Sequence, residues 1–205
     1  MDRRNFSKLS FLMGAGALTG INAGCTGSGE RISEGIYTEP ARRLPTREFD
    51  VVVAGGGTAG VVAAIAAARQ GAKTMLIEAK GYPGGTATEG GTAIHSYYNL
   101  WKAFPGVEKR QVVKGIPAEI IDRLMLVGGT TGHAEMDRGF DYDSICTAVD
   151  TELYKLVTFE MLIEAGVHVA VNTLCAGTIT SGTEVKGVIT ESRSDWRMPS
   201  RGLTL

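Results

Sequence analysis

A short apolar run that stops abruptly at a row of glycines constrains this chain more than any other feature. Residues 49–54 read Phe-Asp-Val-Val-Val-Ala, which predicts a strand buried on both faces and central in a parallel sheet. Residues 55–60 read Gly-Gly-Gly-Thr-Ala-Gly, a match to Gly-x-Gly-x-x-Gly, and the alanine-rich residues 61–70 favour a helix. The order strand, glycine turn, helix predicts an α/β fold that begins with a phosphate-binding turn.

Each glycine of this turn has its own physical task. Gly55 permits the tight turn, Gly57 lets the backbone approach a pyrophosphate, and Gly60 lets the helix and the strand pack closely. The helix that begins near Thr58 directs unpaired backbone N–H groups, including that of Ala59, and the positive end of its dipole toward the phosphates. Anion binding at this turn therefore needs no lysine.

A second strand is predicted at residues 73–77, and it ends at Glu78. The Glu78 carboxylate can hold both ribose hydroxyls of an adenine nucleotide, whereas a 2′-phosphate would be repelled unless Lys80 compensates. NADP is therefore disfavoured, and FAD or NAD remains. An NAD-dependent dehydrogenase would proceed through another helix and strand, but residues 79–88 form a glycine-rich loop, which favours FAD.

With this loop the sequence resembles the FAD-dependent oxidoreductase family of the glutathione-reductase-like flavoprotein class. The resemblance rests on the Pro-Gly-Gly-x-x-Thr segment of residues 83–88 after the ribose acid. It implies that Gly84, Gly85 and Thr86 lie along the pyrophosphate and ribityl chain of FAD.

The resemblance resumes at residues 150–191. Residues 152–165 predict an amphipathic helix, residues 167–171 a strand, and residues 174–180 and 185–191 a small β-hairpin or meander. The expected apolar side of the helix comprises Leu153, Leu156, Val157, Met161 and Leu162. In relatives the backbone of the residue that corresponds to Cys175 touches the adenine, so the resemblance gives Cys175 a cofactor-binding role in which its thiol is incidental.

The expected fold class is α/β, with a Rossmann-like parallel sheet that forms a FAD-binding domain and a small β-meander. Relatives add a closing strand, but the chain after Ser192 lacks the apolar run that a buried strand requires, so the domain is expected to be incomplete at its carboxyl end. The sequence thus favours a truncated FAD-dependent oxidoreductase of unknown substrate. The alternatives are an inactive or residual nucleotide-binding fragment and, less favoured, an NAD-dependent dehydrogenase.

The first residues predict an export address. Arg3 and Arg4 precede the uncharged, glycine-containing run 9–24, which is too short and too weakly apolar for a stable membrane span and resembles a twin-arginine export signal. Residues 23–25 resemble the end of a lipobox, although Asn22 stands where a large apolar residue is usual. Two expectations therefore stay open: a periplasmic protein, or a lipoprotein attached to the membrane through Cys25.

These patterns divide the chain into a twin-arginine-type signal at 1–25, a linker at 26–47 and a partial FAD-binding domain at 48–205, with an insert at about 91–149. The net charge of −1 disfavours nucleic-acid partners. The three cysteines are widely spaced without a Cys-x-x-Cys pair, so no metal site is expected. The electron partner stays unassigned.

The insert offers a single candidate for chemistry. His95 follows the cofactor loop closely and could transfer protons, with a hydrogen-bonded structural histidine as the alternative. Tyr97, Tyr98 and Trp101 could form a substrate wall or pack against a helix predicted at residues 117–127. The acidic residues between 137 and 143 lack the ligand spacing of a calcium loop and predict a solvated turn.

Overall fold

The computed structural model describes residues 41, 43–89, 94–95, 111–135, 145–193 and 197–204, with the backbone alone at 94–95, 135 and 197–204. The predicted signal, Cys25 and most of the 26–47 linker lie outside the described residues, as do the aromatic residues 97–101 and the acidic residues between 137 and 143.

Four parallel strands form the half of the sheet that begins with the predicted glycine-flanked strand. β1 (Arg47–Ala54) pairs in parallel with β2 (Thr74–Ile77) on one side and with β9 (Arg197–Thr204) on the other. β6 (His168–Ala170) continues the sheet beyond β2. The prediction of a central β1 in a parallel sheet is confirmed.

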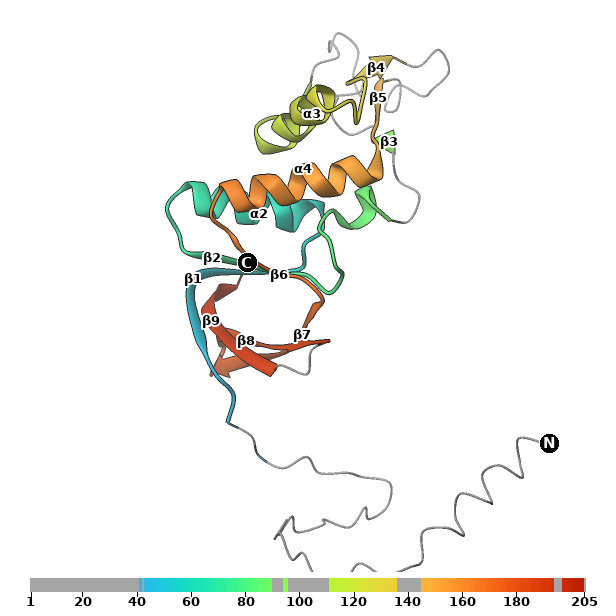
Figure 1. Ribbon diagram of the computed structural model, residues 1–205. Coiled ribbons are helices and arrows are strands. Elements are labelled where there is room, and N and C mark those ends of the chain that lie inside the picture. Colours follow the sequence, from blue (N-terminus) through green and yellow to red (C-terminus); the bar gives the residue numbers. More distant parts are fainter. Residues whose placement is uncertain are drawn as a thin grey trace, which may run out of the picture. The chain divides into compact units, whose positions relative to one another are not determined.

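An antiparallel meander completes the sheet, whose full order is β6-β2-β1-β9-β8-β7 (Figure 1). β7 (Thr173–Ser181) and β8 (Glu184–Ser192) form the predicted hairpin, with Gly182 at positive φ in its turn, and β8 also pairs with β9. The α/β Rossmann-like fold with a small β-meander is therefore confirmed.

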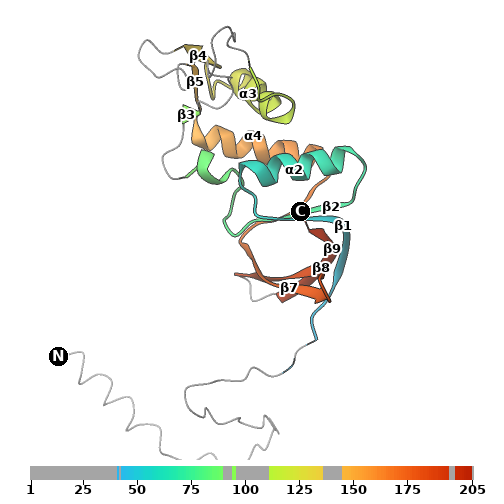
Figure 2. The ribbon, with the colours of Figure 1, turned by 180° about the vertical axis from the view of Figure 1, so that it is seen from behind.

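The alternation of side chains along β1 and β2 builds two cores. Val53 and Leu76 point to the face that carries the helices, where they join the larger core cluster. Val52 and Met75 point to the other face, where they pack with Val188 of the meander. Figures 1 and 2 show the helices on one side of β1 and β2 and the meander strands β7 and β8 on the other. Burial on both faces explains why the second half of β1, residues 51–54, consists of apolar residues alone.

Helices α2 (Thr58–Arg69) and α4 (Thr151–Glu164) cover one face of the parallel strands. α4 begins where Asp150 accepts hydrogen bonds from the N–H groups of Glu152 and Leu153, each at 2.9 Å. Four of the five predicted apolar positions of α4 pack against the core, but the prediction for Leu156 is wrong, because this side chain is 49% exposed.

A buried threonine explains the error at Leu156. The apolar face of α4 is rotated toward Tyr154 and Thr158, both of which are buried. The Thr158 hydroxyl donates to the carbonyl oxygen of Tyr154 at 2.7 Å, so its burial leaves no unsatisfied donor. A pattern that counts only apolar residues cannot detect a buried threonine whose hydroxyl is hydrogen-bonded to a carbonyl oxygen of its own helix.

The insert helix α3 (Ile116–Leu126) docks on α2 and α4. Its buried residues Ile120, Ile121 and Leu124 join the helix-side core. Elsewhere in the insert, β3 (Ile94–His95), β5 (Ile145–Ala148) and β4 (Ala134–Glu135) form a separate antiparallel sheet.

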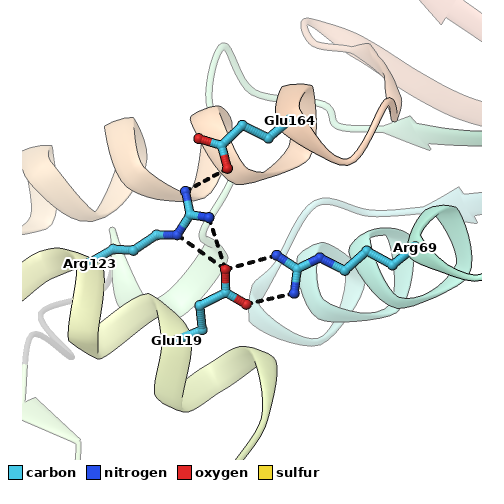
Figure 3. Close-up of polar contacts among 4 residues, drawn as sticks. All are labelled: Arg69, Glu119, Arg123 and Glu164. Atoms are coloured by element: carbon cyan, nitrogen blue, oxygen red, sulfur yellow. Dashed lines mark hydrogen bonds and ion pairs between the residues drawn. The ribbon is translucent and has the colours of Figure 1, made fainter.

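Charged side chains also join α3 to its two neighbours (Figure 3). Arg69 of α2 makes a bidentate pair with Glu119 of α3, at 2.6 and 2.8 Å, and Arg123 of α3 contacts both Glu119 at 2.9 Å and Glu164 of α4 at 2.7 Å. The hydrogen bond from Arg69, above all, holds the pKa of Glu119 below its ordinary value, with a second contribution from Arg123. The Glu119 carboxylate therefore joins α3 to α2, and Arg123 extends the network to Glu164 of α4.

The prediction that the sheet lacks a strand after Ser192 is wrong, because β9 lies between β1 and β8. The facing edges of β1 and β8 present backbone N–H and C=O groups, and a strand placed there satisfies them through its own backbone whatever side chains it carries. An apolar run indicates a strand whose faces are packed in a core, so this criterion missed a strand whose place is supported by backbone pairing with β1 and β8.

None of the helices in the described ranges combines the length and the hydropathy that a bilayer-spanning segment requires. No group of three or more His, Cys, Asp or Glu side chains gathers in a metal-binding arrangement among the described residues.

Candidate cofactor site

The turn between β1 and α2 is built from backbone contacts that only glycine permits. Gly55 has a φ of 106°, a conformation that L side chains rarely adopt, and its N–H donates to the carbonyl oxygen of Ile77 at 2.8 Å. A Cβ atom on Gly60 would lie 1.9 Å from the carbonyl oxygen of Gly55. α2 can therefore start this close to β1 only because residue 60 has no side chain.

The amino-terminal end of α2 presents uncapped N–H groups to open space. Gly57 is its N-cap residue, makes no side-chain capping hydrogen bond, and is followed by no acidic residue in the first turn. A Cβ atom on Gly57 would have no heavy atom within 4 Å. Thr58 and Ala59 open the helix, so their N–H groups and the helix dipole favour an anion at this position.

Glu78 is fixed beside the turn by hydrogen bonds from four directions. Its Oε2 accepts from the N–H of Gly56 at 2.7 Å and its Oε1 accepts from the N–H of Lys80 at 2.8 Å. Its own N–H donates to the Ala170 carbonyl oxygen, and its carbonyl oxygen accepts from Thr173. A carboxylate oxygen has two lone-pair sites, so both oxygens can still accept ribose hydroxyls while their positions are held.

The glycine-rich loop after Glu78 returns to the turn between β1 and α2. The N–H of Gly84 donates to the carbonyl oxygen of Gly56 at 2.8 Å, and Gly57 and Gly84 form an isolated parallel bridge. A Cβ atom on Gly85 would lie 2.8 Å from the Cα atom of Gly57. Thr86 is exposed within the short 3-10 helix η1 (Gly85–Ala87). The predicted glycines of the two segments are thus brought together.

Four side chains close this loop, and of these the sequence alone singled out only Lys80. One carboxylate oxygen of Glu89 accepts a hydrogen bond from the Tyr82 hydroxyl, and the other forms an ion pair with Lys80. The ammonium of Lys155 on α4 lies 4.0 Å from the centre of the Tyr82 ring. These residues carry no periodic or motif signal, so only the folded chain reveals that they meet.

The Lys80 ion pair bears on nucleotide choice. The Lys80 ammonium is paired with Glu89, so its charge is already balanced by a carboxylate. Glu78, the adjacent acid, offers the opposite charge. Both features disfavour a 2′-phosphorylated ligand.

Cys175 and His95 occupy different places. Cys175 lies on β7, and the N–H of Thr173, the first residue of this strand, donates a hydrogen bond to the Glu78 carbonyl oxygen. The Cys175 side chain forms no disulfide, is partly buried and packs against the core residues of β1 and β2. His95 belongs to the separate sheet, opposite Thr147 of β5, and its side chain lies outside the description. The cofactor-contact prediction for Cys175 and the proton-transfer prediction for His95 stay predictions.

The site therefore contains the elements that an adenine dinucleotide needs. The open face at Gly57 leaves room for a pyrophosphate against uncapped N–H groups, and the fixed Glu78 carboxylate has two oxygens that can accept ribose hydroxyls. The residues present fit FAD, although its nicotinamide counterpart shares the same two features.

Comparison with known proteins favours FAD over a nicotinamide dinucleotide through the family to which the chain belongs. Residues 50–202 match the family described as FAD dependent oxidoreductase. A 3-oxosteroid 1-dehydrogenase of Mycolicibacterium smegmatis is 39% identical over 99 residues, which cover 45% of this chain and 16% of the dehydrogenase. Glycerol-3-phosphate dehydrogenase 2 of Mycobacterium bovis is 43% identical over 54 residues, which cover 26% of this chain and 9% of that protein. The chain spans no more than 16% of the length of these two relatives.

Solved structures share the fold at low sequence identity. The open conformation of a flavocytochrome c3 fumarate reductase has a TM-score of 0.53 and 14% identity, with 78% of this chain and 33% of that chain covered. The myxobacterial chondrochloren halogenase CndH, an FAD-dependent halogenase, has a TM-score of 0.52 and 17% identity, with 76% and 36% covered.

Proposed function

The chain belongs to the family of FAD-dependent oxidoreductases, and on that premise we propose that the turn between β1 and α2 holds the FAD pyrophosphate while Glu78 holds the adenosine ribose. The observation that carries the proposal is the open, uncapped start of α2 at Gly57 beside a carboxylate fixed by two N–H groups. We further propose membership of the glutathione-reductase-like class within this family, supported by the loop that returns from Glu78 to the turn.

In this proposal the chain supplies binding and orientation. FAD, when bound, supplies the ring that accepts or donates a hydride. The N–H groups at the start of α2 neutralise the pyrophosphate charge without a lysine, and Gly84 and Gly85 bring the loop backbone within reach of the same phosphates. The substrate would be a small molecule that exchanges a hydride with the flavin.

A flavin titration of the full chain tests the proposal. After removal of small molecules, the protein is titrated with FAD while the flavin absorption and fluorescence are recorded, with Gly57→Val as the disabling variant. The Cβ atom of a valine at this position would have no heavy atom within 4 Å in the ligand-free protein, and its side chain would fill the space that the pyrophosphate needs, so we expect FAD binding to be lost while the fold is kept. Ala66→Val is the matched control, because it adds bulk to an exposed position of the same helix away from the turn.

The outcomes separate the proposal from its alternatives. FAD binding that Gly57→Val removes and Ala66→Val keeps supports the proposal. Absence of FAD binding by folded wild-type protein contradicts it and favours a residual fragment, an alternative that has lost one support because the residues after Ser192 include a strand of the sheet. Protection from thermal unfolding by NAD but not FAD would favour the dehydrogenase alternative.

We also propose export through the amino-terminal signal. The arginine pair at Arg3 and Arg4 and the weakly apolar run that follows support this assignment. A reporter fused to residues 1–47 should reach the periplasm, and the double change Arg3→Lys with Arg4→Lys should retain it in the cytoplasm. Cys25→Ser then distinguishes a lipoprotein, which it would release from the membrane fraction, from a free periplasmic protein, which it would leave unchanged.

A further inference from the structure

One carboxylate ties together both ends of the glycine-rich loop. Glu89, at the end of the loop, pairs through one oxygen with Lys80 at its beginning and through the other with the Tyr82 hydroxyl. The N–H of Glu89 also donates to the Gly85 carbonyl oxygen at 3.0 Å. Glu89 is about one-third exposed and Lys80 is half exposed, so the cluster lies at the rim of the molecule. We call Lys80, Tyr82 and Glu89 the loop clamp.

The loop clamp also contacts helix α4. Lys155, in the first turns of α4, places its ammonium over the Tyr82 ring while its other partner is Glu152 at 2.6 Å. The hydrogen bond to Glu152, first, and the neighbouring Tyr82 raise the pKa of Lys155, so the ammonium stays charged at neutral pH. The loop is therefore fastened to a helix that belongs to the rigid core.

The segment that the clamp closes is the one that lies against the turn. Between Tyr82 and Glu89 the loop contains Gly84 and Gly85, both at positive φ, and Gly84 donates to Gly56. Glycines at such angles lose much conformational freedom when they are ordered, because the unfolded backbone has many other states. A loop that is already closed does not lose that freedom when a ligand binds.

We infer that Glu89 is a positioning residue for FAD: by joining Lys80 to Tyr82 it holds the glycine loop closed over the β1–α2 turn and slows release of the cofactor. The inference rests on the proposed function, and it assigns to Glu89 no contact with the flavin. It follows that loss of the carboxylate weakens FAD binding through the release rate, while the ligand-free protein keeps most of its stability.

Flavin binding by the full chain tests this role. Glu89→Gln keeps the size of the side chain but removes the charge, and it should raise the FAD dissociation constant about tenfold, mainly through faster release. Glu184→Gln is the matched control, because it breaks an exposed ion pair with Lys186 on the β7–β8 hairpin, and its dissociation constant should stay within about twofold of wild type. The melting temperature of ligand-free Glu89→Gln should fall by no more than about 2 °C.

A double-variant cycle separates positioning from a general structural effect. Tyr82→Phe removes the hydroxyl that Glu89 binds, so Glu89→Gln and Tyr82→Phe combined should cost less than the sum of their separate effects on the release rate. Additive effects, or a release rate of Glu89→Gln equal to that of wild type, overturn the inference. If wild type binds no FAD, the proposed function and the inference both fail, whereas equal binding by wild type and Glu89→Gln overturns only the role of Glu89.

Discussion

The turn at the start of α2 and the junction of α2, α3 and α4 are held together by different kinds of contact. In the turn, main-chain groups make most of the contacts, and the residues are glycines because a Cβ atom would collide or strain the chain, as at Gly55 and Gly60. In the junction, two arginines and two glutamates make the contacts (Figure 3). A backbone site leaves a short, dense motif in the sequence, whereas a side-chain junction does not.

The two regions should therefore differ in their tolerance of substitution. A collision between backbone and Cβ has no low-energy escape, because a rigid strand lies on one side and a rigid helix on the other. Exposed charged side chains can turn to solvent or to other partners when one of them is lost, so each pair contributes little. Substitutions in the two regions test this difference.

The largest effect is expected for Gly60→Ala. The added methyl group would lie 1.9 Å from the Gly55 carbonyl oxygen, so α2 must move away from β1. We expect a loss of about 3 kcal/mol in the free energy of unfolding, measured by urea denaturation of the ligand-free protein. Gly57→Ala in the same turn is the control, because no heavy atom lies within 4 Å of its new methyl group and its stability should match wild type within about 0.5 kcal/mol.

Equal stability losses for Gly60→Ala and Gly57→Ala would break the comparison. They would mean that any side chain in the turn lowers the free energy of unfolding, and that the close approach at Gly60 contributes no additional loss. FAD affinity discriminates further, since Gly57→Ala should weaken FAD binding despite an intact fold.

The part of the fold that follows from backbone rules was predictable. The strand at 49–54, the helix from Thr58, the second strand and the hairpin after residue 173 lie within a few residues of their predicted bounds, because apolar runs and glycines mark their ends. The convergence of the glycine turn, Glu78 and the loop could also be anticipated, since consecutive parallel strands end at the same edge of a sheet.

The rest depends on contacts between residues that are distant in sequence. Arg69 and Glu119 are 50 residues apart, and no spacing rule connects them. Glu89 and Tyr82 lie in one irregular loop, where neither helical nor strand periodicity indicates which side chains meet. β9 escaped detection for a related reason, since it pairs with β1 and β8, and no local pattern in its own residues indicates these partners.

A moderate effect is expected at the helix junction. Glu119→Gln removes the carboxylate that Arg69 and Arg123 share, but Arg123 keeps Glu164 and the side chains are about one-third exposed. We expect the free energy of unfolding at neutral pH to fall by about 0.5–1 kcal/mol after allowance for solvent screening. Glu164→Gln, which breaks only the outer contact of the network, should cost less. A loss at Glu119 as large as that at Gly60 would contradict the proposed contrast.

The contribution of Glu119 should also depend on pH. Because the folded pKa of Glu119 lies below its ordinary value of 4.5, its stabilising contribution is complete above that value and is lost as the pH falls through the folded pKa. The difference in unfolding free energy between wild type and Glu119→Gln should therefore be constant at neutral pH and shrink in acid. A difference that persists at a pH of about 2 would show that the network acts through packing and not through charge.

The smallest effect is expected for His168 on the edge strand β6. As with Glu119, a falling pH should reduce the stability of the fold, but here at a higher pH. Desolvation of the ring lowers the pKa of His168, with further contributions from Arg47 and Lys73, and Arg47 donates to Nε2 at 2.9 Å, which requires that nitrogen to be unprotonated. A lowered folded pKa favours the folded state above the ordinary value of 6.5, and this advantage disappears as the pH falls through the folded pKa.

His168→Gln retains a hydrogen-bond acceptor but cannot titrate. Wild type should therefore lose a few tenths of a kcal/mol relative to this variant just below pH 6.5, well above the range in which Glu119 titrates, because the ring is largely exposed. Urea denaturation of both proteins from neutral pH to about pH 5 measures this difference. If the unfolding free energies of the two proteins change in parallel over the whole pH range, solvent screens the charge of the ring completely. The position of β6 would then depend on the buried residues of β1 and β2 and not on the charges at the sheet edge.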